Sequence, residues 1–168
     1  GCGPMSLVQD FLPHGCLRHQ DLHLRALSLN PPDPARNQLA TYHFGMFLDH
    51  FSGAVGSIDL RLGDDHDTNH FGGQIGYGVH PDHRGRGLAA RSLRLLVPLA
   101  RKHGFEQLWV TCDPDNQASR RTCERAGAIL HEILDIPVGH AMYARGIRQK
   151  CRFRLDLALA DGRPAEGF

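Results

Sequence analysis

The sequence has almost no excess charge of either sign: 19 Lys and Arg residues stand against 18 Asp and Glu residues, a formal net charge of +1. Nucleic-acid binding usually needs a broad basic surface, so this balance argues against such a partner and restricts any basic site to a local one. The chain also lacks a signal-peptide pattern and an apolar run long enough to span a membrane. We therefore expect neither a nucleic-acid partner nor a membrane partner.

Cysteines are few and irregularly placed, and their number is odd, so they do not suggest a disulfide framework. They are Cys2, Cys16, Cys112, Cys123 and Cys151. We expect a reduced, cytoplasmic protein.

The 168 residues, 41% of them hydrophobic, suit one domain with a real core. Residues 1–4 precede Met5 and look like a remnant of tag removal, so we expect a single domain over residues 5–168.

Hydrophobic periodicity predicts a mixed α/β sheet. Alternation and β-rich composition predict strands at residues 23–29, 41–48, 54–62, 72–79, 106–112, 128–136 and 151–159. Apolar positions three and four apart predict a helix over residues 87–103, which Pro98 should kink or end early. A second helix is predicted over residues 116–126, with Gly127 in the favoured C-cap position.

Residues 63–70 hold three aspartates and two histidines, which raises the question of a metal site. No apolar scaffold or regular His spacing fixes those side chains, so a solvated loop is the favoured interpretation and we expect no metal.

The stretch HPDHRGRGLAARSL, residues 80–93, lies where a predicted strand gives way to a helix. The first N–H groups of a helix lack intrahelical partners and carry partial positive charge, and glycines let an anion approach them. Arg84 and Arg86 add full charges that suit phosphate. A pyrophosphate seat and a glycine-rich turn with solvent-facing arginines are both compatible with this stretch alone.

Two common phosphate loops fit poorly. The dinucleotide fingerprint tolerates Ala90, but its acidic residue is poorly matched and several strands precede the motif. The P-loop ending in Gly-Lys-Ser/Thr is absent. A dinucleotide-binding module remains an alternative, which predicts stabilisation by NAD.

A third pattern fits better. The segments GQIGYGVHPDHRGRGLAARSLRLLVPLA and LWVTCDPDNQASRRTCERAGA resemble the GNAT superfamily of acetyl-CoA-dependent N-acetyltransferases. Arg84-x-x-Gly87-x-Ala89 is similar to that family's pyrophosphate motif, and Asn116 to Ser119 is similar to its second motif. The resemblance implies a central, mostly antiparallel sheet that splays at the acetyl-CoA site, with flanking helices.

The same resemblance implies a set of cofactor contacts. The backbone near Val79 would pair with the pantetheine arm, the amides of the arginine-glycine loop would hold the pyrophosphate, and Ser119 would line the arm. The implied acetyl-CoA contacts are Val79, Arg84, Gly85, Arg86, Gly87, Leu88, Ala89, Ala90, Asn116 and Ser119. Asn116 is also simply a good helix N-cap, and both roles can hold at once.

The sequence departs from the family pattern at the acid and the base. Cys123 stands where many relatives carry a tyrosine acid, and Gly73 stands where some carry a glutamate base. The catalytic candidates are therefore Asn116, Cys123 and Tyr77, although core packing is at least as good an interpretation of Cys123. The candidates for the base are Asp59, His70 and Tyr77, with water as a further possibility. Cys112, His131 and His140 receive no role.

The acceptor side is the least informative part of the sequence. In the family two helices usually wall this site, but here only the short proline-rich stretch at residues 31–38 occupies that position. We expect an open cleft, or one closed by a second subunit of a homodimer. The predicted function is acetyl transfer to a primary amine of a small molecule, amino acid or peptide, as the resemblance to bacterial acetyltransferases of unassigned substrate implies. The alternative is a non-catalytic acyl-CoA-binding or sensor module.

Overall fold

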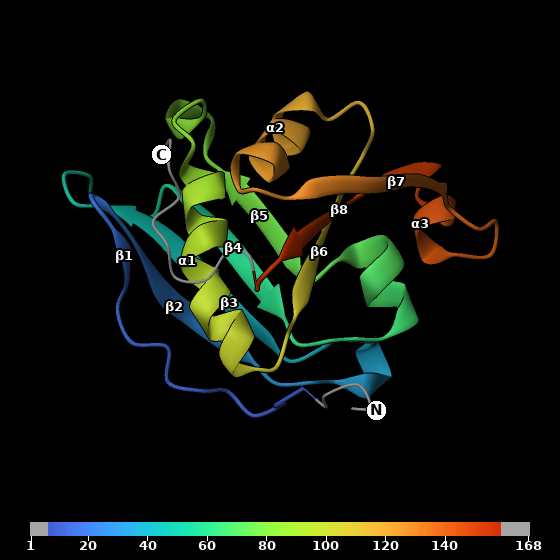
Figure 1. Cartoon of the computed structure of the whole chain (residues 1–168), viewed down its shortest axis with the longest axis horizontal. Helices are drawn as coiled ribbons and strands as arrows, with labels where there is room; N and C mark the ends of the chain where they lie inside the picture. Colours follow the sequence, from blue (N-terminus) through green and yellow to red (C-terminus); the bar gives the residue numbers. More distant parts are fainter. Residues whose placement is uncertain (1–6, 159–168) are drawn as a thin grey trace.

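The computed structural model describes residues 7–158, so the suggested tag remnant at residues 1–4 lies outside the described residues. Two antiparallel sheets form its framework (Figure 1). The larger has the order β1-β2-β3-β4-β5 and the smaller the order β6-β8-β7. The strands are β1 Leu17–His19, β2 Leu22–Asn30, β3 Thr41–Leu48, β4 Gly56–Arg61, β5 Ile75–Val79, β6 Gln107–Cys112, β7 Ile129–Asp135 and β8 Gln149–Asp156.

Helices cover and connect the two sheets. In chain order they are η1 Pro34–Arg36, η2 Thr68–Gly72, η3 Pro81–His83, α1 Leu88–Lys102, α2 Gln117–Arg125 and α3 Ala141–Ala144. Figure 1 shows α1 crossing one face of the larger sheet. All strand pairs within residues 7–158 are antiparallel. This confirms the predicted mixed fold and argues against a dinucleotide-binding module, since that fold is built on a parallel sheet.

The core lies between α1 and the larger sheet. In β4 the residues alternate between buried and half-buried, as the predicted period of two requires. Ile58 and Leu60 thereby face α1, whose Leu93 and Leu96 are fully buried. The other face of β4 carries Asp59 and the residues that border the site below.

Pro98 does not end α1, which continues to Lys102. The proline is exposed, whereas its neighbours Val97 and Leu99 are buried. The missing backbone bond therefore falls on the solvent side of the helix, and packing of the apolar face holds the last turn in place. The prediction of an early end was wrong.

Part of the predicted acidic loop is also helical, because the five residues of η2 wind into a π-helix. Asp65 accepts hydrogen bonds from the backbone N–H of Thr68 at 3.1 Å and from its hydroxyl at 2.6 Å. Thr68 and Phe71 are buried against the rest of the molecule. Burial of this side of the turn, which the polar sequence does not suggest, explains the difference.

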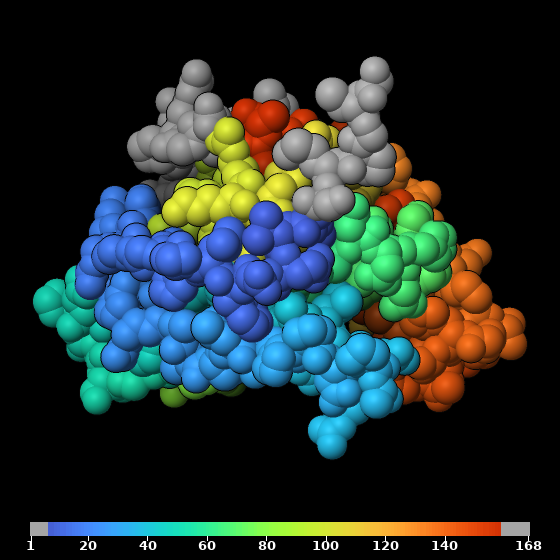
Figure 2. Space-filling model, turned by 90° about the horizontal axis from the view of Figure 1, so that it is seen from below, coloured from blue at the N-terminus to red at the C-terminus, as the bar shows by residue number. Residues whose placement is uncertain are grey.

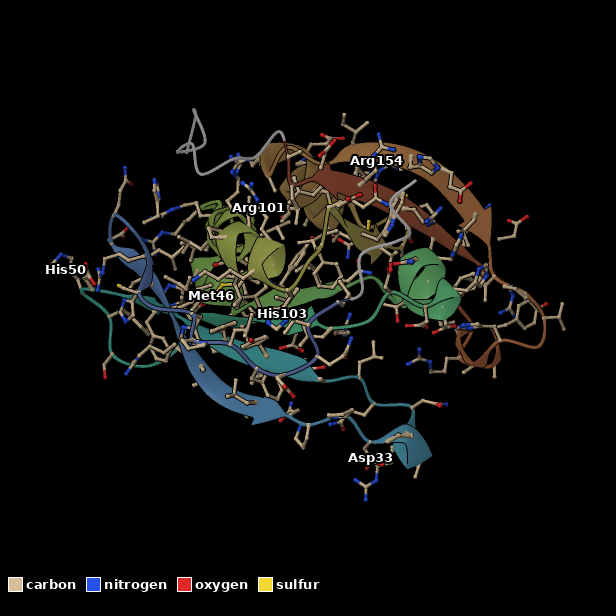
Figure 3. All side chains as sticks on the ribbon, turned by 60° about the horizontal axis from the view of Figure 1, so that its bottom comes forward. Asp33, Met46, His50, Arg101, His103 and Arg154 are labelled. Carbon is tan, nitrogen blue, oxygen red and sulfur yellow. The ribbon has the colours of Figure 1, made fainter. Side chains whose placement is uncertain are left out.

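A buried histidine ties the N-terminal segment to the core. His103 donates from Nδ1 to the Val8 carbonyl at 2.6 Å, so its Nε2 accepts from the Tyr42 hydroxyl at 2.6 Å. Figure 3 shows His103 in the interior below α1, whereas Asp33 and His50 lie at the periphery. Figure 2 shows the segment before β1 and the strands β1 and β2 covering one side of the molecule. Within residues 7–158 no helix is long and apolar enough to cross a membrane.

Candidate acetyl-CoA site

The two sheets meet at the residue just before β5 and then separate. Gln74, just before β5, donates its backbone N–H to the Trp109 carbonyl at 3.0 Å, and its side-chain Oε1 accepts from the Trp109 N–H at 2.7 Å. Beyond this contact β5 is the edge strand of the larger sheet and β6 is an edge strand of the smaller one. The strands therefore splay, as the family resemblance implied.

Gly73 allows this close contact. Its φ is +71°, and a Cβ built on it would lie 2.6 Å from the Trp109 carbonyl oxygen. An L-residue would be strained there and would also push against backbone. A glutamate at this position would meet the same backbone atoms and would open the junction.

The free edge of β5 points into the gap. His80 N–H donates to Val55 O, and Gln74 O accepts from Arg61 N–H, each at 2.8 Å. Backbone groups alternate along a strand, so those of Ile75, Tyr77 and Val79 face away from β4 and toward β6. The Val79 carbonyl accepts from Nε of Arg84 at 3.0 Å, in agreement with this alternation.

A cavity of about 670 Å³ fills the gap between the splayed strands and reaches the start of α1. It brings together most of the predicted site residues, namely Tyr77, Val79, Arg84, Gly85, Gly87, Leu88, Ala89, Asn116 and Ser119. The remaining predicted residues, Arg86, Ala90 and Cys123, do not line it. The volume is typical of a small-molecule site.

The N-terminus of α1 closes one end of the cavity. Gly87 is its N-cap with φ +70°, and Gly85 has φ +80°, so both positions favour glycine. The first backbone bond of the helix runs from Arg91 N–H to Gly87 O. The preceding amides, those of Leu88 and Ala89 among them, therefore have no intrahelical partner and present positive charge to the cavity.

Two arginines that the sequence analysis missed reinforce this end. Arg121 and Arg125, one helical turn apart on α2, line the cavity, and Nη1 of Arg125 lies 3.5 Å from a Cβ built at Gly87. Arg86 instead turns toward His83 Nδ1, 3.4 Å from its Nη1. The spacing of Arg121 and Arg125 was a usable signal, but their direction depends on how α2 packs.

Tyr77, Ser119 and Asn116 form a connected group at the middle of the cavity. The Tyr77 and Ser119 hydroxyl oxygens lie 2.6 Å apart, and Asn116 Oδ1 accepts from the Ser119 N–H at 3.1 Å. Asn116 thus caps α2, as predicted. Burial, with the neighbouring Cys123 thiol as a smaller cause, raises the pKa of Tyr77 well above its ordinary value, so this hydroxyl stays protonated.

Cys123 and Cys112 differ in whether they line the cavity. Cys123 is fully buried in the core, and burial raises the pKa of its thiol to about 12. Cys112 lines the cavity, and burial raises its pKa to about 11. The core position favours the packing interpretation of Cys123, because the thiol does not face the cavity.

Of the candidates for the base, Asp59 lies opposite Gly76 in the β4–β5 register, on the face away from α1. Its Oδ1 lies 2.5 Å from His43 Nδ1. His70 contacts the His66 carbonyl at 2.8 Å and does not line the cavity.

The acceptor side lacks the usual helical wall between the first strands. Between β2 and β3 the only helical segment is η1, three residues long. Short helices from elsewhere in the chain border the cavity instead, since Phe71 of η2 and Met142 of α3 line it. Residues distant in sequence thus line part of the cavity, while the connection between β2 and β3 provides only η1.

Residues 8–129 match the family model of the acetyltransferase (GNAT) domain. The chain belongs to the GNAT acetyltransferase family. This membership confirms the resemblance and, at the level of the family, the prediction of an acetyl-CoA-dependent acetyltransferase. No curated protein matches the chain.

Solved structures resemble this GNAT chain in fold. A probable acetyltransferase (GNAT family) from Chromobacterium violaceum has 18% identity and a TM-score of 0.64, with 94% of this chain and 93% of that chain covered. The ribosomal-protein-S5-alanine acetyltransferase of Vibrio fischeri has 9% identity and a TM-score of 0.60, covering 89% and 99%. The microcin C7 self-immunity acetyltransferase MccE, in complex with acetyl-CoA and AMP, has 16% identity and a TM-score of 0.52. The match covers 69% of this chain but only 61% of MccE.

Proposed function

We propose that this GNAT chain transfers an acetyl group from acetyl-CoA to a primary amine by direct attack. The observation that carries the proposal is one cavity that joins the unpaired amides of α1 to the free edge of β5. Acetyl-CoA supplies a thioester, whose carbonyl is the electrophile. The donor groups fit this cofactor, because a diphosphate needs amides and cations while an amide-bearing arm needs free strand edges.

The pyrophosphate end is assigned to the start of α1. The N–H groups of Leu88 and Ala89 would donate to phosphate oxygens, and Gly85 and Gly87 leave room for them to approach. Arg125 would add a full positive charge beside Gly87. The backbone N–H of Val79, whose carbonyl already accepts from Arg84, would then pair with the pantetheine arm.

The chemistry requires alignment, a proton acceptor for the amine and a proton donor for the leaving sulfur. Backbone N–H groups on the free edge of β5 would stabilise the developing oxyanion. Ser119 would donate its hydroxyl proton to the departing sulfur and regain one from Tyr77, 2.6 Å away, and water entering as CoA leaves would return a proton to Tyr77. Asn116 holds Ser119 in place through the cap of α2.

Tyr77 thus takes the role of the acid that the family usually places where Cys123 stands. Burial keeps the Tyr77 hydroxyl protonated but also makes it a weaker acid, so its hydrogen bond to Ser119 is what supports this role. Asp59, paired with His43, is the base that we propose for the incoming amine; it does not line the cavity itself, so it would act through water at the face opposite α1.

The test is steady-state transfer from acetyl-CoA to a panel of amines, measured by release of free thiol, with acetyl-CoA binding measured by calorimetry. Tyr77→Phe should lower kcat about a hundredfold, the usual size of a general-acid contribution, with little change in acetyl-CoA affinity. Tyr143→Phe is the matched control, because Tyr143 does not line the cavity.

Three results would count against the proposal. An unchanged kcat in Tyr77→Phe would remove the hydroxyl from the mechanism. Binding of acetyl-CoA without turnover on any amine would favour the non-catalytic acyl-CoA-binding module. Absence of binding would reject the site.

A further inference from the structure

Arg61, the last residue of β4, reaches across the face opposite α1 to the beginning of β5. Its Nη1 donates to the carbonyls of Gly72 at 3.2 Å and Gly73 at 3.1 Å. Two backbone acceptors therefore fix the guanidinium at the point where the strands start to splay. Arg61 lines the same cavity as Tyr77.

Gly76 makes room for this side chain. A Cβ built at Gly76 would lie 2.5 Å from Nη2 of Arg61 and 3.3 Å from its Cζ. The guanidinium therefore lies directly against the backbone of β5, one residue before Tyr77. Tyr77 pairs with Ile58, so its side chain lies on the α1 face, and Arg61 borders the cavity from the opposite side of β5.

The charge on Arg61 has no carboxylate partner among residues 7–158. Asp59, two residues earlier, is held by His43 at 2.5 Å. Lys150, the other cation at this end of the cavity, has Asp113 Oδ1 at 3.0 Å. Arg61 also keeps donors at Nε and Nη2 for which the described residues provide no acceptor.

Apolar side chains complete this end of the cavity. Phe71 of η2 precedes Gly72, whose carbonyl accepts from Arg61, and is 7% exposed. Met142 of α3 is half-buried, and both residues line the cavity. The acceptor end thus combines one unpaired cation with apolar surface, and a guanidinium is well suited to a carboxylate.

We propose that Arg61 binds the carboxylate of the amine acceptor and that this acceptor is a free α-amino acid with an apolar side chain. The inference rests on the proposed function. An α-amino acid matches the site because its amine and carboxylate sit on one carbon, and the proposed base Asp59 and Arg61 lie two residues apart on the same face of β4. Phe71 and Met142 would contact the side chain.

The experiment compares phenylalanine with phenethylamine, which differs only by the carboxylate. The wild-type enzyme should prefer phenylalanine, and Arg61→Gln should raise the KM for phenylalanine about 10- to 100-fold, the usual effect of losing a hydrogen-bonded charge. The KM for phenethylamine, which has no carboxylate, should change much less than the KM for phenylalanine. Arg36→Gln, which removes an exposed arginine of η1, is the matched control.

A second variant and a binding measurement test the role of Arg61 independently of the first variant. Gly76→Ala keeps all charges but displaces the guanidinium, so it should also raise the KM for phenylalanine. Hydrocinnamate, which has the carboxylate and no amine, should bind the CoA-loaded enzyme in calorimetry and should lose affinity in Arg61→Gln. This readout does not depend on turnover.

The outcomes separate this proposal from the one on which it rests. Transfer to phenethylamine but not to phenylalanine, or an unchanged KM for phenylalanine in Arg61→Gln, would overturn the role of Arg61 while the acetyltransferase activity stands. Absence of transfer to every amine would overturn both. Preference for phenylalanine that is lost in both variants supports the proposal.

Discussion

Gly87 offers a direct test of the pyrophosphate seat, through the pair of variants Gly87→Asp and Gly87→Asn. The two side chains have the same shape and both tolerate the left-handed backbone at φ +70° better than most residues do. A Cβ at this position meets only Nη1 of Arg125, at 3.5 Å, an ordinary contact. Both variants should therefore fold, and their difference isolates one negative charge.

The size of the effect follows from Coulomb's law. Two unit charges about 5 Å apart near a protein surface repel by about 3 kcal/mol. The new carboxylate would also pair with Arg125 and withdraw that cation from the phosphates. We expect the Kd for acetyl-CoA to be about a hundredfold higher in Gly87→Asp than in Gly87→Asn, since 1.4 kcal/mol is about tenfold.

Calorimetric titration with acetyl-CoA at two salt concentrations is the assay, with thermal unfolding of each free variant as the check on folding. The difference between the variants should shrink as salt rises, because screening weakens exposed charge pairs. Equal affinities of the Asp and Asn variants at low salt would refute the placement of the phosphates at the start of α1.

Two predictions concern stability. Gly73→Ala should lower the free energy of unfolding in urea by about 3 kcal/mol, because its Cβ would meet the Trp109 carbonyl at a strained backbone position, whereas Gly72→Ala, with open space around it, should change it little. The free energy of unfolding should also fall between pH 9 and pH 11, since burial raises the pKa of Cys112 to about 11 and that of Cys123 to about 12 from a value of 9.0. In that range the unfolded thiols lose protons that the folded thiols keep, so the unfolded state binds fewer protons. Cys123→Ala should make this fall less steep, and an unchanged slope in a pH series of chemical denaturation would contradict the assignment.

Local patterns in the sequence predicted what depends on neighbouring residues. The alternation in β4 determined which of its side chains enter the core. Asn116 marked the start of α2, because an N-cap side chain needs only the amide three residues later. The loop before α1 was predicted as an anion site for the same reason, since its glycines and the first turn of the helix are consecutive.

Contacts between distant residues could not be predicted in this way. Ser119 meets Tyr77 across 42 positions, and Arg61 meets a glycine of the next strand beyond a long connection. The directions of these side chains follow from the splay of β5 and β6 and from the packing of α2. The same packing of α2 places Cys123 in the core and not at the cavity.

The sequence by itself determined most of the strands, the two longer helices α1 and α2, and the glycine-rich loop before α1, because each depends on periodicity or on a single turn of chain. Only the tertiary structure decided which side chains share the cavity. Arg125 faces Gly87 while Arg86 turns away, although both are arginines near the same motif. The physical reason is that a side chain's direction depends on how its element packs against elements far away in sequence.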